Sequence, residues 1–143
     1  MKLSTKGRYA VMAMIDIATN LEDKENVSIQ AIAERNNIST SYLEQLFIKL
    51  KKNNLVSSSK GPNGGYKLAR APKDIFIFDV IQAVDEKIEF LRCKNGSGCA
   101  KNGFCNSHDL WSSLMANICN YLSSISLEEV INNTYNNNIL GAK

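Results

Sequence analysis

Three of the four cysteines and the only histidine lie close together, between positions 93 and 108. Cys93, Cys99, Cys105 and His108 have the spacing C-x5-C-x5-C-x2-H. Thiolate and imidazole ligands suit zinc or an iron–sulfur cluster and suit calcium or magnesium poorly. The glycine and asparagine residues between the cysteines allow the chain to turn around a buried ion. The pattern therefore predicts a metal or cluster site built from these four side chains.

The spacing favours a cluster and leaves zinc open, because structural zinc sites usually contain a closer pair of cysteines. Two plainer interpretations are a single disulfide with one thiol left over and a surface role for His108. Catalysis by a cysteine nucleophile is disfavoured, because Asp109 is the one acid beside His108 and no oxyanion site is indicated. Cys119 falls within a helical apolar pattern and is predicted to pack in the core.

Composition places this site in a small protein of the cytoplasm. The chain has 143 residues and 44% hydrophobic content, enough for one domain with a core, or one domain with an appended arm. The longest apolar run, Tyr9 to Ile15, is far too short for a membrane span, and the first residues lack a signal-peptide core. A reducing cytoplasm favours thiolates that bind metal over stable disulfides.

Positive charge is concentrated in one part of the chain. Residues 49–73 contain no acid and seven basic residues: Lys49, Lys51, Lys52, Lys60, Lys67, Arg70 and Lys73. The rest of the chain carries 10 basic and 14 acidic residues, although the net charge is +3. A basic patch on an acidic body is what binding to a phosphate backbone requires, whereas a solvated basic face is the plainer interpretation.

The first half of the chain predicts a helix-turn-helix. A mostly buried helix is expected from about Ser4 to Leu21, a short one after Ser28 that ends at Asn36 and Asn37, and a third after Ser39. Apolar residues at 43, 46, 47 and 50 give the third helix a buried stripe. An ordinary helical hairpin is the alternative. The residues of this helix predicted to contact DNA are Ser41, Tyr42, Glu44, Gln45, Lys49 and Lys52.

A wing is expected after the third helix. The run L-V-S-S-S-K-G-P-N-G-G-Y-K-L-A predicts two strands joined by a turn rich in glycine, and Lys60, Asn63 and Gly64 at this turn are further candidates for DNA contact. No G-K-[ST] follows the glycines, so a nucleotide-binding loop is not indicated. Ile75 to Ile77 is expected to form a strand that closes the wing's sheet, or else to open the helix expected from Phe78 to Asp85.

The last long helix is predicted to pair two copies of the chain. Its apolar stripe is wide and far in sequence from the first core, although packing within one chain is the alternative. The residues assigned to the dimer seam are Trp111, Leu114, Ile118, Tyr121, Leu122 and Ile125. Ser126 is expected to cap a short helix. The predicted fold is mainly α with a small β-wing: a winged helix-turn-helix domain (1–85), a ligand loop (86–108), the dimerisation helix and the short helix (106–131), and a flexible tail (132–143).

Five segments together resemble a bacterial family of dimeric winged-helix regulators, that of IscR, NsrR and CymR. They are K-L-S-T-K-G-R-Y-A, I-S-T-S-Y-L-E-Q-L-F, G-P-N-G-G-Y, D-V-I-Q-A-V-D-E and R-C-x5-C-x5-C-x2-H-x-L-W, and the match covers about residues 2–131. The resemblance implies that Cys93, Cys99, Cys105 and His108 ligate a 2Fe-2S cluster. It also implies a homodimer that binds double-stranded operators, controls genes of cluster assembly and receives its cluster from the assembly machinery.

One position departs from the family pattern, and several alternatives stay open. The wing tip is arginine in much of the family and Lys60 here, so the planar fork for groove contacts is absent while the charge is kept. Nitric oxide sensors of the family have similar cysteine spacing, but H-x-L-W favours the iron–sulfur regulators. Zinc, a 4Fe-4S cluster, a cluster-free redox regulator, and a scaffold or electron carrier that never touches DNA are the remaining alternatives.

Overall fold

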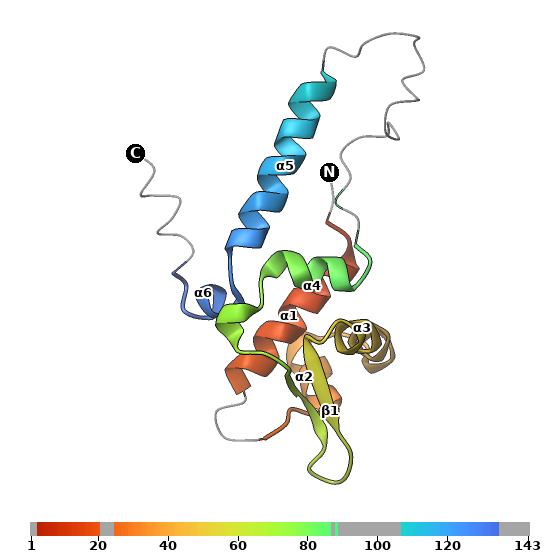
Figure 1. Ribbon diagram of the computed structural model, residues 1–143. Coiled ribbons are helices and arrows are strands. Elements are labelled where there is room, and N and C mark those ends of the chain that lie inside the picture. Colours follow the sequence, from red (N-terminus) through yellow and green to blue (C-terminus); the bar gives the residue numbers. More distant parts are fainter. Residues whose placement is uncertain (1–2, 21–24, 87, 89–106, 135–143) are drawn as a thin grey trace.

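The computed structural model describes residues 3–20, 25–86, 88 and 107–134, and the other residues lie outside the description. The helices in these residues are α1 (Thr5–Asn20), α2 (Ile29–Asn36), α3 (Thr40–Lys52), the 3-10 helix η1 (Pro72–Asp74), α4 (Ile77–Ala83), α5 (His108–Ser124) and α6 (Leu127–Ile131). The strands are β1 (Val56–Ser59) and β2 (Gly65–Leu68). Helices α1 to α4 and the hairpin form one body, from which α5 projects (Figure 1). The predicted fold class, mainly α with a small β-wing, is confirmed.

Helix α1 runs through the middle of this body. It touches α2, α3, α4, α6 and β2, and Ala10, Ala13, Met14 and Ile17 on it are fully buried. The alanines allow neighbouring helices to approach closely, and the larger side chains fill the space between them. The prediction of a central, mostly buried first helix is therefore confirmed.

The boundaries of α2 and α3 follow from capping residues, as predicted. Ser28 Oγ accepts a hydrogen bond from Ala31 N at 3.2 Å, and Ser39 Oγ accepts one from Tyr42 N at 3.4 Å. Asn37 ends α2 in the left-handed conformation, with φ of 52°. Each serine side chain satisfies a backbone donor that has no partner within its helix. The tight turn between the two helices is thus determined by their polar residues.

A buried acid fastens α1 to α2. Asp16, with a side chain 7% exposed, receives Arg35 Nη2 at 2.6 Å and Arg35 Nε at 2.9 Å on its two oxygens. Asn36 Nδ2 donates to the same carboxylate at 2.9 Å. The pKa of Arg35 is raised, mainly because of its hydrogen bond to Asp16. A carboxylate can stay charged in a core when several donors surround it in this way.

The wing is an antiparallel hairpin that leans on α3. Val56 pairs with Leu68 and Ser59 with Gly65 at the two ends of the ladder. The rings of Phe47 on α3 and Tyr66 on β2 lie 4.4 Å apart, centre to centre. This contact joins the underside of α3 to the wing.

The prediction that Ile75 to Ile77 forms a strand of the wing's sheet is wrong. The third pairing of the wing comes from Val27, which forms a bridge with Tyr66 through two hydrogen bonds of 2.8 Å. Gly65 makes this approach possible, because a Cβ there would lie 2.4 Å from the Val27 oxygen. Phe76 instead pairs with Ser126, and Ile77 opens α4, in agreement with the alternative prediction for this segment.

The chain returns to the winged-helix body after α5. Leu127 N donates to Ile75 O at 2.8 Å, and α6 packs against α1 and η1. Ser126 caps α6 as predicted, in a reciprocal pair with Glu129. Ile125 is 5% exposed within its own chain. Its assignment to a dimer seam is therefore corrected, because this side chain already belongs to the core.

Helix α5 itself stays largely uncovered. None of its residues is fully buried, and Cys119 is partly exposed. The prediction that Cys119 packs in the core of its chain is wrong, because α5 projects away from that core (Figure 1). None of the helices that the structure describes has the length and apolar content needed for a membrane span.

Replacing Asp16 with alanine should lower the free energy of unfolding by about 2–3 kcal/mol, because Arg35 and the partly buried Asn36 would lose the buried acceptor that joins α2 to α1. Urea denaturation followed by circular dichroism measures the change. The matched control is Asp74→Ala, which removes an exposed carboxylate and should shift stability by less than about 0.5 kcal/mol. Equal losses of stability in the two variants would contradict the role given to Asp16.

Candidate nucleic-acid interface and cluster ligands

The outer face of α3 presents most of the predicted DNA contacts to solvent. Leu43, Leu46, Phe47 and Leu50 are buried on the inner face, as predicted. The side chains of Ser41, Glu44, Gln45 and Lys52 are exposed on the opposite face. Since Ser41 lies three and four residues before Glu44 and Gln45, and Lys52 lies seven after Gln45, these polar side chains share one side of the helix. A helix with such a stripe can enter the major groove of DNA.

Two of the predicted α3 contacts are partly engaged by the protein itself. Tyr42 packs at the edge of the core, with its ring perpendicular to that of Tyr9 at 5.9 Å between centres. Lys49 Nζ lies 2.7 Å from Asp85 Oδ2, beyond the end of α4. The hydrogen bond from Lys49 is the main cause of the lowered pKa of Asp85. Lys49 is therefore less free to meet a phosphate than Lys52.

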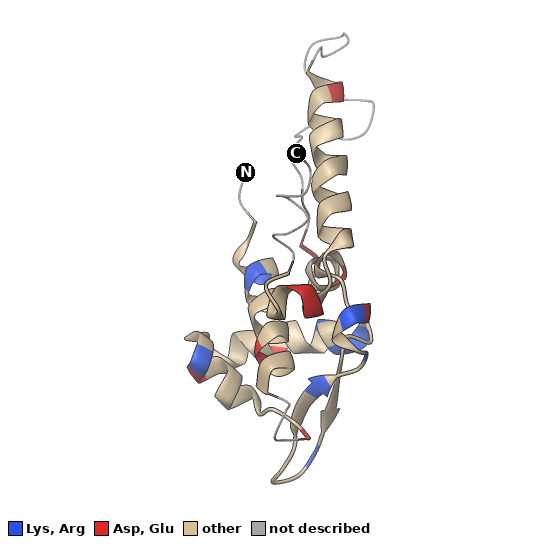
Figure 2. Cartoon of the chain, turned by 90° about the vertical axis from the view of Figure 1, so that its left-hand side faces the viewer, with Lys and Arg blue, Asp and Glu red and all other residues tan. Residues whose placement is uncertain are grey.

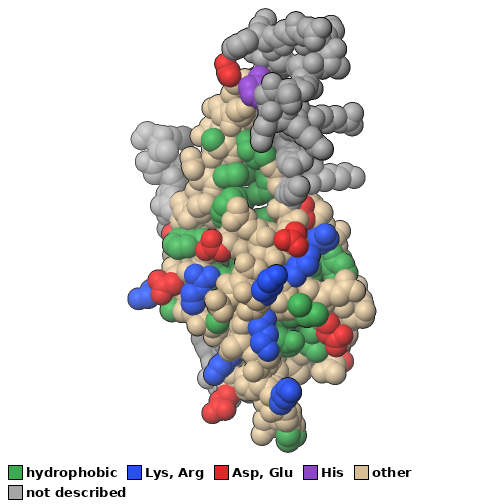
Figure 3. Space-filling model, turned by 45° about the vertical axis from the view of Figure 1, so that its right-hand side comes forward, with side chains coloured by type: hydrophobic (Ala, Val, Ile, Leu, Met, Phe, Trp, Pro, Cys, Tyr) green, Lys and Arg blue, Asp and Glu red, His purple; other side chains and the backbone are tan. Residues whose placement is uncertain are grey.

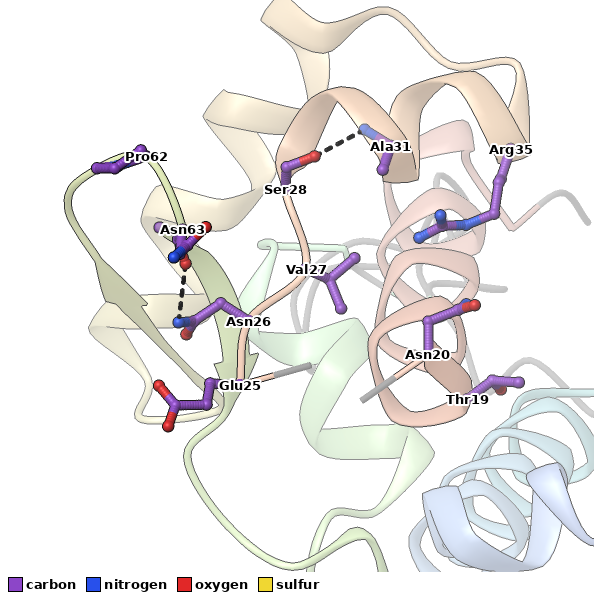
Figure 4. A pocket seen from close by; sticks show the side chains of 11 residues that line it. Thr19, Asn20, Glu25, Asn26, Val27, Ser28, Ala31, Arg35, Pro62 and Asn63 are labelled. Carbon is purple, nitrogen blue, oxygen red and sulfur yellow. Dashed lines mark hydrogen bonds between the residues drawn. The ribbon is translucent and has the colours of Figure 1, made fainter. Parts of the chain in front are cut away.

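The wing turn carries the other predicted DNA contacts. Lys60 and Asn63 are exposed at the tip. Gly64 has a structural reason to be glycine, because a Cβ there would lie 2.4 Å from the Ser59 oxygen. The Asn63 oxygen accepts a hydrogen bond from Asn26 Nδ2 at 3.3 Å (Figure 4). This bond holds the turn against the segment that leads into α2.

A second contact that the sequence did not reveal joins α3 to the wing. Lys51 Nζ donates to Ser58 Oγ on β1 at 2.6 Å. Such a pairing across a turn leaves no periodic signal, and only the general run of basic residues pointed to Lys51. The wing and α3 are thus positioned as a unit. Lys and Arg residues occur along this part of the chain (Figure 2), and their side chains lie over its surface (Figure 3).

A polar cleft lies beside the helix-turn-helix. It has a volume of about 640 Å³ and lies between the end of α1, the start of α2 and the wing turn (Figure 4). Asn20, Arg35 and Asn63 contribute polar groups to its lining. Asn26 Oδ1, which is buried, has no partner among the described residues. The cleft was not predicted, because its residues come from three separate segments.

The predicted ligands fall at the edge of the described residues. Cys93, Cys99 and Cys105 lie outside them. His108 is exposed as the first residue of α5, and its Nε2 is 3.5 Å from Ser112 Oγ. An exposed imidazole that makes this one long contact with the described residues is available to a metal. The helix N-terminus on which it stands favours a nearby negative charge, such as that of thiolate ligands.

The segment that holds the cysteines follows the winged-helix body and precedes the projecting helix α5. Before it, Glu86 accepts hydrogen bonds from the backbone of Ser4, at 3.0 Å, and from its hydroxyl, at the start of α1. After it, α5 runs to Ile125, whose oxygen accepts from Ile77 N at 3.0 Å. The chain is therefore attached to the body just before the segment and again at the far end of α5.

The exposed face of α5 contains three of the six predicted dimer residues. Trp111, Leu114 and Tyr121 are 41%, 37% and 40% exposed, and Leu110 is 60% exposed. Ile118 is partly buried, whereas Leu122 packs against the core of its own chain. An apolar stripe of this size on a projecting helix is unusual for a surface that meets only water.

Comparison with known proteins gives one consistent result. The chain matches the family described as "Rrf2: Iron-dependent Transcriptional regulator" over residues 3–133. The HTH-type transcriptional regulator IscR of Photorhabdus laumondii is 49% identical over 133 residues, which span 93% of this chain and 80% of that protein. The solved structure of T. potens IscR has a TM-score of 0.75 at 37% identity, covering 94% of this chain and 88% of the other. CymR, the global cysteine regulator of B. subtilis, has a TM-score of 0.78 at 31% identity, covering 92% and 97%.

A winged helix with an exposed polar reading helix and a basic hairpin defines a DNA-binding transcriptional regulator, and the relatives are regulators rather than enzymes. The chain belongs to the Rrf2 family. The resemblance found in the sequence motifs is thereby confirmed, as is the prediction of transcriptional regulation.

Replacing Lys60 with glutamine should weaken DNA binding and reduce the slope of log affinity against log salt concentration by about 0.9 for each phosphate that the side chain no longer neutralises. Fluorescence anisotropy with a duplex at several salt concentrations measures this slope. The matched variant Lys60→Arg keeps the charge, so its slope should equal that of the wild type. An unchanged slope in Lys60→Gln would mean that the wing tip does not touch a phosphate.

Proposed function

We propose that this protein is a homodimeric regulator that senses iron–sulfur clusters and controls genes of cluster assembly. In this proposal Cys93, Cys99, Cys105 and His108 hold a 2Fe-2S cluster, and α3 and the wing bind operator DNA. The observation that carries the proposal is the C-x5-C-x5-C-x2-H set, which ends on the exposed first residue of α5. The relatives named IscR support it at up to 49% identity.

The donor set fits a cluster chemically. Three thiolates and one imidazole provide four ligands for the two irons. When bound, a 2Fe-2S cluster would supply iron that changes oxidation state, and the cluster would be lost when the supply of clusters falls. A neutral imidazole brings less negative charge to the irons than a fourth thiolate would. The site is therefore expected to hold its cluster less tightly than four cysteines would, which suits a sensor of supply.

The fold alone does not select this signal. CymR, which its name describes as a cysteine regulator, has a TM-score of 0.78 to this chain. The same winged-helix fold therefore occurs in a regulator of another kind, so the ligand residues must determine the signal. A zinc-bound or cluster-free regulator, or one that senses nitric oxide, is the second candidate, because thiolates bind zinc and react with oxidants as well.

The attachments of the ligand segment suggest how occupancy reaches the DNA. Just before the segment, Asp85 contacts Lys49 on α3, and Glu86 contacts Ser4, the residue before α1. His108, at its other end, begins the exposed helix α5. We infer that ordering of the 93–108 loop changes the position of the dimer's two winged-helix domains relative to the paired α5 helices. The two half-sites of an operator would then lie about one helical turn apart, ~34 Å.

Anaerobically purified wild type should be coloured, with about two irons and two acid-labile sulfides per chain, as expected for a 2Fe-2S cluster. Visible absorption together with iron, zinc and sulfide assays gives the counts. His108→Ala should change the spectrum, and Cys93→Ser should lose most of the iron, because each removes a ligand. Cys119→Ser is the matched control, because it removes a thiol outside the ligand set and should keep the wild-type iron content.

Two outcomes would contradict this proposal. Colourless or zinc-loaded protein from cells that make clusters normally would favour the second candidate. Equal affinity of loaded and cluster-free protein for every operator would leave the cluster without a regulatory role, even if the ligands were as assigned.

Leu114→Glu should shift the protein from dimer to monomer, weakening self-association by at least about tenfold, because a charge cannot be buried unpaired in an apolar seam. Sedimentation velocity measures the species present. Asn120→Glu is the matched control: Asn120 is exposed and lies on the side of α5 away from the apolar stripe, so this variant should remain dimeric. A wild type that sediments as a monomer would contradict the homodimer.

A further inference from the structure

An isoleucine interrupts the polar stripe of α3. Ile48 is 68% exposed, which is more than any other large hydrophobic side chain in the part of the chain that the structure describes. It lies three residues after Gln45, four after Glu44 and four before Lys52. These spacings place it on the same outer face as those three side chains.

Neither folding nor pairing of two chains accounts for this residue. The buried side chains of α3 lie on its inner face. The other strongly exposed apolar side chains, apart from Leu3, belong to α5. A β-branched residue also stabilises an exposed helix position less than alanine, leucine or lysine would. Single exposed apolar residues are common on protein surfaces, so the informative feature is its place at the middle of a reading face.

The major groove offers one apolar group to such a side chain. Base edges there present hydrogen-bond donors and acceptors, with the exception of the C5-methyl group of thymine. An isoleucine pressed against a donor or acceptor would leave that group without a partner, which costs free energy. Against a thymine methyl, the same side chain removes apolar surface from water on both sides.

We infer that Ile48 is a specificity-determining residue that recognises the methyl group of a thymine in the operator half-site. The inference rests on the proposed role of α3 as the reading helix. Three residues of helix advance the side chain by about 4.5 Å along the axis, so the thymine is expected about one or two base pairs from the base that Gln45 contacts.

Replacement of thymine by deoxyuridine removes only the methyl group and tests the inference directly. A duplex selected by the wild-type protein from a random library serves as the probe, with each thymine replaced in turn by deoxyuridine. At one position in each half-site the replacement should weaken wild-type binding about fourfold, the value for one buried methyl group. In Ile48→Ala the weakening at that position should disappear, and in Ile48→Val it should remain.

Two further variants separate this inference from the proposed function. Lys52→Ala, on the same face, should weaken binding equally to thymine and deoxyuridine duplexes, because it removes a charge. Gln45→Ala should weaken binding to the selected duplex if α3 reads the DNA. Ile48→Ala should keep the wild-type unfolding midpoint, since its side chain is mostly in water.

The outcomes are distinct. If Gln45→Ala lowers affinity while wild type and Ile48→Ala respond identically to deoxyuridine at every position, the thymine contact is wrong and the reading helix stands. If neither Gln45→Ala nor Lys52→Ala affects binding, α3 is not the reading helix and the inference falls with it.

Discussion

The carboxylate of Asp16 is the constraint on which the placement of the reading helix depends. Its three shortest hydrogen bonds come from Arg35 and Asn36, the last two residues of α2. The turn at Asn37 and the cap at Ser39 then leave little freedom before α3 begins. Because Asp16 lies on the central helix α1, its hydrogen bonds to the end of α2 fix the start of α3 relative to the core. An apolar contact at this point would allow sliding, whereas a bidentate pair with arginine fixes direction as well as distance.

The attachments of the proposed ligand segment are weaker than this clamp, and that difference suits a switch. The pair between Lys49 and Asp85 is largely in water, where ion pairs contribute little to stability. It nevertheless gives α3 a direct connection to the residues that precede the segment. A rearrangement of the 93–108 loop can therefore change this contact at small cost, while Asp16 keeps the helix-turn-helix intact. In the proposed mechanism, sensing and folding would thus depend on different interactions.

Local chemistry allowed much of this fold to be predicted from the sequence. The caps at Ser28, Ser39 and Ser126 and the turn at Asn37 act within a few residues, so their side chains predict helix boundaries directly. The errors concern partners that are distant in sequence. Phe76 pairs with Ser126 fifty positions later, and the wing's third pairing comes from Val27, which precedes it. The I-F-I-F run did not indicate which segment it would pair with. Likewise, the single acid in the apolar first helix did not indicate that it would pair with Arg35. Exposure likewise depends on where α5 points, which is why Ile125 and Cys119 were misplaced.

T. potens IscR and CymR, described as a global cysteine regulator, have almost equal structural similarity to this chain, with TM-scores of 0.75 and 0.78. The winged helix is therefore a DNA-binding fold shared by these regulators, and the signal must depend on other residues. In this chain the candidate input lies between Glu86, which contacts Ser4, and α5, which leads back to the winged-helix body at Ile125. The candidate output lies on the outer face of α3, where Ser41, Glu44, Gln45 and Ile48 meet solvent. Because these two sets of residues share no side chain, operator preference and signal can change independently, and a family built on one fold can thus serve many regulatory circuits.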